Sequence, residues 1–199
     1  MPSYEVLYFD GAGRAEIIRI MLSIAKADWK DTRIQGKDWP RVKPTTPLES
    51  LPVLKIDGVS HVQSVALARY AGRLAGWYPD DPLEALVVDE TMESLNEIMS
   101  KAPKSNDPGE LKKLREEYQE TTLTKYAGFF EAAIQKNGGV GFSKKPSIAD
   151  IAMKSVVTGV STGDWTHIDP TFFDTYPGIM ATVKMVEDNE DIKAYYAPK

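Results

Sequence analysis

The chain has 199 residues, of which 42% are hydrophobic and 27% charged, and this composition is typical of a globular protein with one large domain or two small ones. It has no cysteine, which excludes disulfides, zinc–thiolate sites, iron–sulfur clusters and cysteine nucleophiles. Its formal net charge is −5 and its lysines and arginines are scattered, which argues against nucleic acid as a partner. With no signal-peptide pattern and no apolar run of membrane-spanning length, we expect a soluble cytoplasmic protein that does not bind membranes.

The first strand and helix are predicted from residues 4 to 25. Tyr4–Phe9 is rich in β-branched and aromatic residues, which favours a strand, and the breaker Gly11-Ala12-Gly13 follows it. Apolar residues then recur at helical spacing, and three charged residues are expected on the opposite, polar side of that helix: Arg14, Glu16 and Arg19. Trp29–Ile34 is a second predicted strand, parallel to the first because a helix connects them.

A loop, a hairpin and a helix follow. The proline-rich segment 39–51 predicts a loop with at most a helical turn. Asp57-Gly58 stands between the apolar runs 53–56 and 59–62, and this pair tolerates the positive φ angles of a two-residue hairpin turn. Ser64 is then expected to cap a helix over 65–74. The order β-α-β, loop, β-β-α predicts a thioredoxin-like domain.

The rest of the chain is predicted to be helical. Residues 77–82 are rich in breakers and separate the thioredoxin-like domain, 1–76, from an all-α domain, 83–199. Helical periodicity covers four segments: Leu83–Met99, Leu111–Ile134, Ile148–Val160 and Gly178–Asp188. Ser147 and Asp150 match a capping box at the start of the third segment, for which we expect a structural role. The only histidines, His61 and His167, are far apart in sequence, so no metal site is expected.

Tyr8 is the candidate for chemistry at the end of the first strand. Without cysteine, a thioredoxin-like domain cannot exchange dithiols, so another group must act at this position. A phenol beside a helix N-terminus can donate a hydrogen bond to a thiolate. Lowering a thiol pKa of about 8.5 by about two units requires about 2.7 kcal/mol, which one such bond and a nearby cation, Arg14, could supply. The local alternative is a strand-end aromatic residue beside a solvated arginine.

Two further motifs are suited to a peptide-like ligand. A cis Leu51–Pro52 bond would turn the Leu51 N–H and C=O outward, where they could pair as an added strand does. The alternative is an ordinary trans proline that ends a loop. Gln63-Ser64 offers a hydroxyl and free N–H groups at a helix start, a suitable site for a carboxylate. The alternative there is a simple N-cap serine.

Taken together, these residues resemble the sigma class of glutathione transferases, which includes haematopoietic-type prostaglandin D synthases and S-crystallins. The similarity covers most of the chain, and its densest matches are Tyr8-Phe9, 13–19, 38–40, 51–54, Gln63-Ser64 and 68–70. The resemblance implies the glutathione transferase fold, with Tyr8 activating the thiol of glutathione, the co-substrate, and Arg14 helping it. It also implies a homodimer in which Glu97 approaches the γ-glutamyl amino group of the glutathione bound to the other subunit.

The resemblance divides glutathione among three pairs of residues. It assigns the glycine end to Trp39 and Lys43, the cysteinyl backbone to Leu51 and Pro52, and the γ-glutamyl carboxylate to Gln63 and Ser64. Leu48-Glu49-Ser50 replaces a segment that usually reads Phe-Gly-Gln or Phe-Gly-Lys. Ser50, also placed among the glutathione-binding residues, therefore has a shorter reach, and affinity could be lower.

The implied reaction is conjugation of glutathione to small hydrophobic electrophiles in detoxification, with isomerisation or peroxide reduction as related reactions. We expect the electrophile between Tyr8 and the helices around Met99 and Val156. The loop 101–110 lacks the aromatic residue of prostaglandin-synthesising members, so prostaglandin D synthesis is not predicted. The alternative is a non-catalytic protein, either a ligand carrier or a structural protein like the S-crystallins.

Overall fold

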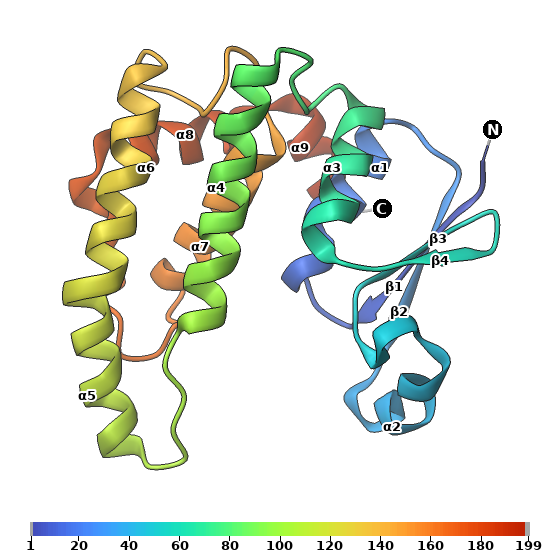
Figure 1. Cartoon of the computed structure of the whole chain (residues 1–199), viewed down its shortest axis with the longest axis horizontal. Coiled ribbons are helices and arrows are strands. Elements are labelled where there is room, and N and C mark those ends of the chain that lie inside the picture. The colour runs from blue at the N-terminus through green and yellow to red at the C-terminus, as the bar shows by residue number, and fades with distance from the viewer. Residues whose placement is uncertain (1, 198–199) are drawn as a thin grey trace. The chain divides into compact units, whose positions relative to one another are not determined.

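The computed structural model describes residues 2–197, which form a mixed β-sheet with its helices followed by a series of longer helices (Figure 1). Internal contacts group the chain into two compact units: unit 1 is Met1–Tyr78 with Glu190–Lys199, and unit 2 is Pro79–Asn189. The predicted order of a thioredoxin-like domain before an all-helical region is confirmed. The domain borders drawn from the sequence, 1–76, 77–82 and 83–199, stay a prediction.

Unit 1 is built on a four-stranded sheet in the order β2-β1-β3-β4. The strands are β1 (Tyr4–Phe9), β2 (Trp29–Ile34), β3 (Val53–Ile56) and β4 (Val59–His61). As predicted, β1 and β2 are parallel and β3 and β4 form a hairpin, while β1 pairs with β3 in the antiparallel direction. The helices are α1 (Glu16–Ile24), α2 (Trp39–Val42), α3 (Ser64–Ala75) and α9 (Glu190–Tyr196), and both α3 and α9 pack against α1.

The strand directions bring several segments to one end of the sheet. Leu7 pairs with Val53 and Leu54 with His61, so the end of β1, the start of β3 and the end of β4 lie together. The segments that precede β3 and follow β4 therefore meet beside Tyr8. Short 3₁₀ helices shape the connections: η1 (Gly13–Ala15), η2 (Gly36–Asp38), η3 (Lys43–Thr45) and η4 (Pro47–Glu49).

Two expectations about the helices of unit 1 are wrong. Glu16 and Arg19 do not face solvent but are buried, with 7% and 0% of their surface exposed, and only Arg14 is exposed. They are buried because the strand β2 supplies Asp31 as an ion-pair partner to Arg19, and α9 packs on α1. Ser64 is not the N-cap of α3 but its first residue, and Gln63 is the capping position.

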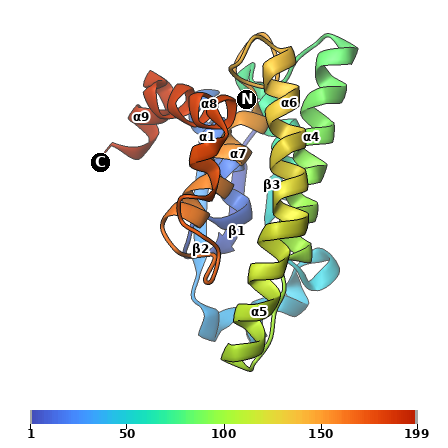
Figure 2. The same ribbon diagram turned by 90° about the vertical axis from the view of Figure 1, so that its left-hand side faces the viewer.

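Unit 2 consists of helices, and one of them, Ile148–Ser161, is largely buried. They are α4 (Pro82–Lys101), α5 (Pro108–Tyr118), α6 (Thr124–Lys136), α7 (Ile148–Ser161) and α8 (Pro177–Asp188), with the short 3₁₀ helix η6 (Phe172–Thr175). Figure 2 shows α5 and α6 as one rod, joined through the π-helical turn Gln119–Leu123. Helix α7 contacts α4 and α8, and the predicted capping box of Ser147 and Asp150 at its start is confirmed.

Two kinds of feature are absent from the described residues 2–197. No helix among them has the length and apolar character needed to cross a membrane. No group of three or more histidine, aspartate or glutamate side chains is gathered there as it would be around a metal ion.

Candidate active site

Tyr8 lies half-buried near the end of β1, beside the start of the next helical segment. The backbone N–H of Arg14 donates a hydrogen bond to Tyr8 Oη over 3.2 Å. A phenol has one donor and two acceptor lone pairs, so this bond uses an acceptor position and leaves the hydroxyl proton for another partner. The Tyr8 phenol is thus set up to donate to an anion while a backbone dipole points at its oxygen.

Gly13 makes this approach of backbone to phenol feasible. Its φ is +45°, a left-handed conformation that glycine adopts without steric cost. A Cβ atom at this position would lie 2.6 Å from Tyr8 Oη and 2.8 Å from a ring carbon of the same side chain. The glycine of the predicted breaker therefore has a specific function here: it leaves space for the Tyr8 hydroxyl.

The buried cation beside Tyr8 is Arg19, which the sequence reasoning missed as a functional candidate. Its guanidinium carbon lies 5.7 Å from the centre of the Tyr8 ring. The side chain of Arg14, the predicted cation, is exposed and has no ion-pair or hydrogen-bond partner within the described part of the chain. The only sequence signal for Arg19 was its spacing of three residues from Glu16, which an exposed helical pair would also show.

Trp39 is linked to Tyr8 through the ring of Phe9, and Leu51 packs on the same buried cluster as Trp39. The rings of Tyr8 and Phe9 have centroids 5.8 Å apart, and those of Phe9 and Trp39 are 5.5 Å apart in an edge-to-face arrangement. Trp39 and Leu51 both pack on the buried cluster of Leu7, Ile34 and Val53. The structure thus brings these two predicted site residues to the sheet end where Tyr8 lies.

The Leu51–Pro52 peptide bond is cis, as the family resemblance implied, so the alternative of an ordinary trans proline is wrong. Leu51 precedes β3 and is half-buried, while Pro52 is buried. Within residues 2–197, the Leu51 N–H donates to no backbone carbonyl. This donor is therefore available to a ligand.

Lys43, Glu49 and Ser50 lie on the exposed connection between α2 and β3. Lys43 Nζ is 3.4 Å from Glu49 Oε2, so the predicted ligand-binding cation has an acidic neighbour. Leu48 and Glu49 have φ angles of 55° and 46°, values that are unusual for residues with a side chain. Ser50 is exposed.

Gln63 and Ser64 stand at the start of α3, after the end of β4. Gln63 has φ 76° and ψ 97°, a sparsely populated conformation, and makes no side-chain capping bond to α3. Gln63 is exposed and Ser64 half-buried. No hydrogen bond of either side chain is found in the described chain, so both polar groups remain available at this helix N-terminus.

Glu97 belongs to α4 in unit 2 and is held by neighbours in the same unit. Its carboxylate forms an ion pair with Lys101, one helical turn further on. The hydrogen bond from Lys101 lowers the pKa of Glu97, and a hydrogen bond from Tyr126 adds to this effect. Glu97 is therefore an ionised, partly exposed carboxylate on α4.

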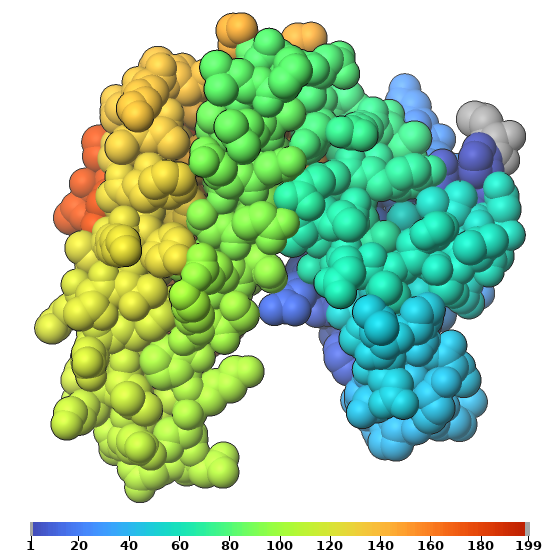
Figure 3. Space-filling view, in the orientation of Figure 1, coloured from blue at the N-terminus to red at the C-terminus, as the bar shows by residue number. Residues whose placement is uncertain are grey.

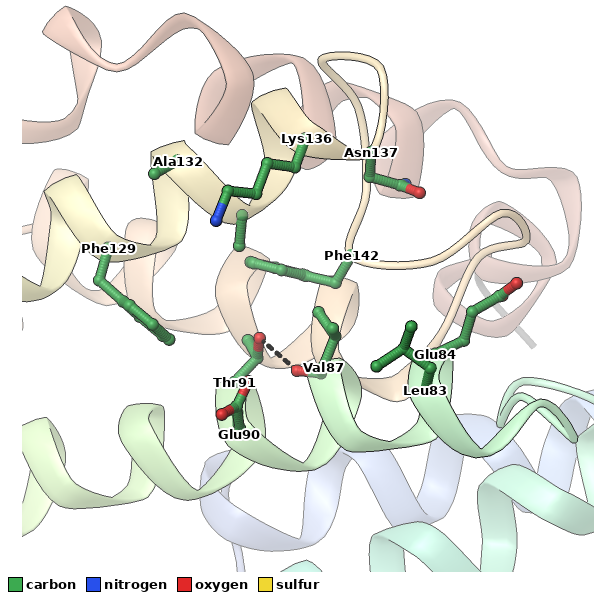
Figure 4. A pocket seen from close by; sticks show the side chains of 11 residues that line it. Leu83, Glu84, Val87, Glu90, Thr91, Phe129, Ala132, Lys136, Asn137 and Phe142 are labelled. Carbon is green, nitrogen blue, oxygen red and sulfur yellow. Dashed lines mark hydrogen bonds between the residues drawn. The ribbon is translucent and has the colours of Figure 1, made fainter.

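A separate pocket of about 320 Å³ lies in unit 2, between the first turns of α4 and the end of α6 (Figure 4). Leu83, Val87, Phe129 and Phe142 give it an apolar lining, and Glu90 and Lys136 add charge. None of the predicted site residues lines it. Of the residues expected around the electrophile, Met99 is 36% exposed on α4 and Val156 is buried in α7, so that site stays a prediction.

Comparison with known proteins identifies the family. Residues 93–199 match the family model described as "Glutathione S-transferase, C-terminal domain". A glutathione S-transferase of Anopheles gambiae is 29% identical over 204 aligned positions, which cover all of this chain and 98% of the relative. The S-crystallin SL11 of Nototodarus sloanii is 30% identical, with 98% of this chain and 96% of the relative covered.

A solved structure gives the same result over the whole chain. The prostaglandin synthase D of Nilaparvata lugens superimposes with a TM-score of 0.86 at 34% identity and covers 100% of both chains. The resemblance inferred from the sequence is therefore confirmed, including its prostaglandin synthase and S-crystallin members. The chain belongs to the glutathione S-transferase family.

Proposed function

We propose that this glutathione transferase activates the thiol of glutathione with Tyr8 and transfers the resulting thiolate to small apolar electrophiles. The observation that carries the proposal is the hydrogen bond from the Arg14 N–H to Tyr8 Oη. Because that bond uses an acceptor position of the phenol, the Tyr8 proton is left to donate to the glutathione sulfur. In the reaction the thiol releases its proton to water, the thiolate sulfur forms a bond to the electrophilic carbon, and the bond from that carbon to the leaving group breaks, so that the leaving group departs with the electron pair as an anion.

The energy required is within reach of these groups. Ionising a thiol of pKa about 8.5 near pH 6.5 needs about 2.7 kcal/mol of preferential stabilisation of the thiolate. A hydrogen bond to a charged group contributes about 1.5–3 kcal/mol. The helix N-terminus after β1 adds positive potential on the same side, and the guanidinium carbon of Arg19 lies 5.7 Å from the centre of the Tyr8 ring. No metal or second cofactor is needed for this step.

The tripeptide itself would lie across the sheet end. Its cysteinyl backbone would pair with the free Leu51 N–H beside Pro52, as an added strand does. Its γ-glutamyl carboxylate would accept from Gln63 and Ser64, whose polar groups are unused at the start of α3.

The glycine end would reach Trp39, Lys43 and Ser50. The aromatic packing of Trp39 on Phe9 supports this placement, because it holds the indole at the sheet end. Glu49 competes for Lys43, so we expect weaker binding at this end.

We also propose that the chain forms a homodimer through unit 2, in which Glu97 serves the glutathione of the partner subunit. The support is apolar side chains left in solvent on α4 and α6: Leu83 is 70%, Leu86 52% and Phe129 46% exposed. The two helices lie side by side on the face that Figure 3 shows, α4 in green and α6 in yellow. Leu83 and Phe129 also line the same pocket, and exposed apolar surface that is gathered in this way marks interaction sites.

Light scattering on a sizing column tests the dimer. The wild-type protein should have twice the monomer mass, and Leu83→Glu with Phe129→Glu should shift it to the monomer. A wild-type monomer at micromolar concentration would remove the role proposed for Glu97.

The activity is tested with purified protein on immobilised glutathione and with a generic aryl halide. We expect retention and conjugation, with Tyr8→Phe retained but about 10- to 100-fold slower, the factor that one hydrogen bond to a charged group represents. Retention without turnover by the wild-type protein would instead identify a carrier. Formation of prostaglandin D is a separate assay, suggested by the name of the Nilaparvata lugens relative.

A further inference from the structure

Arg19 is a charged side chain with no exposed surface at all. An unpaired charge in such a place would cost several kcal/mol, so its partners must compensate it. Two carboxylates do so: Arg19 Nε donates to Asp31 Oδ1 over 3.0 Å, and Nη1 donates to Glu16 Oε2 over 3.4 Å. Helix α9 covers this group, since Tyr195 contacts Glu16 and its burial raises the pKa of the Tyr195 phenol.

The remaining hydrogen bonds of Arg19 go to the end of β1 and the segment that follows it. Its Nη1 donates to the carbonyl oxygen of Gly11 over 2.6 Å and of Ala12 over 3.3 Å, and Nη2 lies 3.5 Å from the carbonyl oxygen of Phe9. Two of these carbonyls, those of Gly11 and Ala12, belong to the residues directly before Gly13 and Arg14. The planar guanidinium therefore holds the turn from which the Arg14 N–H reaches the Tyr8 hydroxyl.

We propose that Arg19 is the residue that positions the Tyr8 hydroxyl for its role in the reaction. It does so in two ways: its fork of N–H groups holds the carbonyls of Phe9, Gly11 and Ala12, and its charge faces the Tyr8 ring from 5.7 Å. This inference rests on the function proposed above. Arg19 touches no substrate in it and acts through the turn and the phenol.

Arg33 provides a matched control on the same carboxylate. Its Nε donates to Asp31 Oδ2 over 2.8 Å, and its Nη1 lies 3.3 Å from Asp10 Oδ1. Its side chain is 40% exposed, and no contact of Arg33 with the 9–12 carbonyls is found within residues 2–197. Arg33→Met therefore removes an arginine from Asp31 and a side-chain contact from Asp10, and it leaves the hydrogen bonds of Arg19 to the carbonyls of Phe9, Gly11 and Ala12 in place.

The experiment compares Arg19→Met, Arg19→Lys and Arg33→Met with the wild-type protein. In Arg19→Met the pH profile of kcat/KM for conjugation should move to higher pH by about one unit. At pH values below the wild-type apparent pKa of the bound thiol, this shift lowers kcat/KM about tenfold. KM for the electrophile should stay the same. Arg33→Met should keep the wild-type profile. A partly misfolded sample would lower the rate without moving the profile, which separates positioning from stability.

Arg19→Lys keeps the charge, and its ammonium cannot reproduce the planar fork, so it covers the case in which Arg19→Met does not fold. The pH profile of Arg19→Lys should differ from the wild-type profile by at least half of the shift that Arg19→Met shows. A folded Arg19→Met or Arg19→Lys with the wild-type pH profile would overturn the proposal.

The amide signal of Arg14 in a ¹H–¹⁵N NMR spectrum gives a readout that does not depend on activity. It should move in both Arg19 variants and stay in place in Arg33→Met, because only the former release the turn. If the wild-type protein conjugates nothing, the proposed function fails, and the NMR comparison still decides the role of Arg19. An Arg14 amide signal that stays unchanged in the Arg19 variants would refute the positioning role of Arg19.

Discussion

The backbone of Gly13 lies so close to the Tyr8 hydroxyl that a single added carbon, at 2.6 Å, would collide with it. The Arg14 N–H bound to the same oxygen comes from the next residue along the chain. Gly13 thus sets where the Tyr8 oxygen can be, and the neighbouring amide holds it there.

Gly13→Ala should displace the Tyr8 hydroxyl and slow conjugation. The Tyr8 side chain can rotate away from the new methyl group, so we expect about a tenfold or greater loss in kcat. The loss of stability should be only about 1–2 kcal/mol, the cost of a left-handed alanine. Steady-state kinetics and urea unfolding measure the two effects separately.

Combining Gly13→Ala with Tyr8→Phe tests whether the two residues act together. If Gly13 acts through Tyr8, the double variant should be no slower than Tyr8→Phe alone, because the hydroxyl is already missing. Losses that multiply would mean that Gly13 affects the reaction by another route. Gly36→Ala is the control, since a Cβ there meets nothing within 4 Å.

Glu49→Gln should strengthen the binding of glutathione. Glu49 pairs with Lys43 over 3.4 Å, and the two side chains are 63% and 46% exposed. If Lys43 binds the glycine carboxylate, removing the competing charge should lower KM for glutathione about two- to fivefold, the range of an exposed ion pair. The gain should shrink at high salt because the pair is screened.

The background Lys43→Met serves as the control for this effect. Glu49→Gln should bring little gain there, since the cation that it frees is absent. An equal gain with and without Lys43 would show that Glu49 acts by general repulsion of the ligand. An unchanged KM in both backgrounds would remove Lys43 from the site.

The order of elements could be predicted because it follows from local patterns. Three local signals depend only on neighbours in sequence, and the structure reproduces them: the β-branched and aromatic run Tyr4–Phe9, the Asp57-Gly58 turn and the helical periodicity after residue 82. Tyr8 could be chosen because the end of a strand before a breaker is a local signal. The strand context left the isomer before Pro52 open, and only the family resemblance implied the cis bond.

The parts that could not be predicted depend on contacts between distant residues. Arg19 looks like a solvent-exposed helical residue until β2 brings Asp31 to it and α9 covers Glu16. Gln63 has a positive φ, which local propensity does not favour, and it is the N-cap of α3. The sequence pattern therefore predicted the N-cap one residue too late, at Ser64. Likewise, the sequence pointed to the side chain of Arg14, whereas its backbone N–H makes the contact with Tyr8.

Glu131→Ala should destabilise the protein by about 2–3 kcal/mol. The Glu131 carboxylate accepts the N–H groups of Gly178 at 2.9 Å and Ile179 at 3.0 Å, and so caps α8 from α6. Removing it leaves two backbone donors of a partly buried helix start without a partner. Urea unfolding measures the loss, and the exposed Glu187→Gln on α8 should change stability by less than about 0.5 kcal/mol.

The contribution of Glu131 should disappear in acid. Burial raises the pKa of Glu131, but hydrogen bonds from Gln135, Gly178 and Ile179 outweigh burial and hold the pKa below 4.5. A lowered pKa means that the stabilisation is complete above the unfolded value and is lost as pH falls through the folded one. The difference between wild type and Glu131→Ala should therefore shrink below about pH 4. A difference that stays constant down to pH 3 would contradict the capping by charge.

Asp150 should give the opposite pH dependence. It accepts the N–H groups of Phe142 at 3.0 Å and Ser147 at 2.6 Å, yet burial raises its pKa from 3.8 to about 6. The folded state then binds the proton more tightly than the unfolded one, so this carboxyl makes stability fall by up to about 3 kcal/mol as pH rises from 4 to 6. Asp150→Asn cannot titrate, and the stability advantage of the wild type over it should grow as pH falls through that range.

The exposed Asp80→Asn should follow the wild type in urea unfolding at each pH. If the gap between wild type and Asp150→Asn is the same at pH 4.5 and pH 7, the buried carboxyl does not titrate in this range, and its hydrogen bonds keep it ionised in spite of burial.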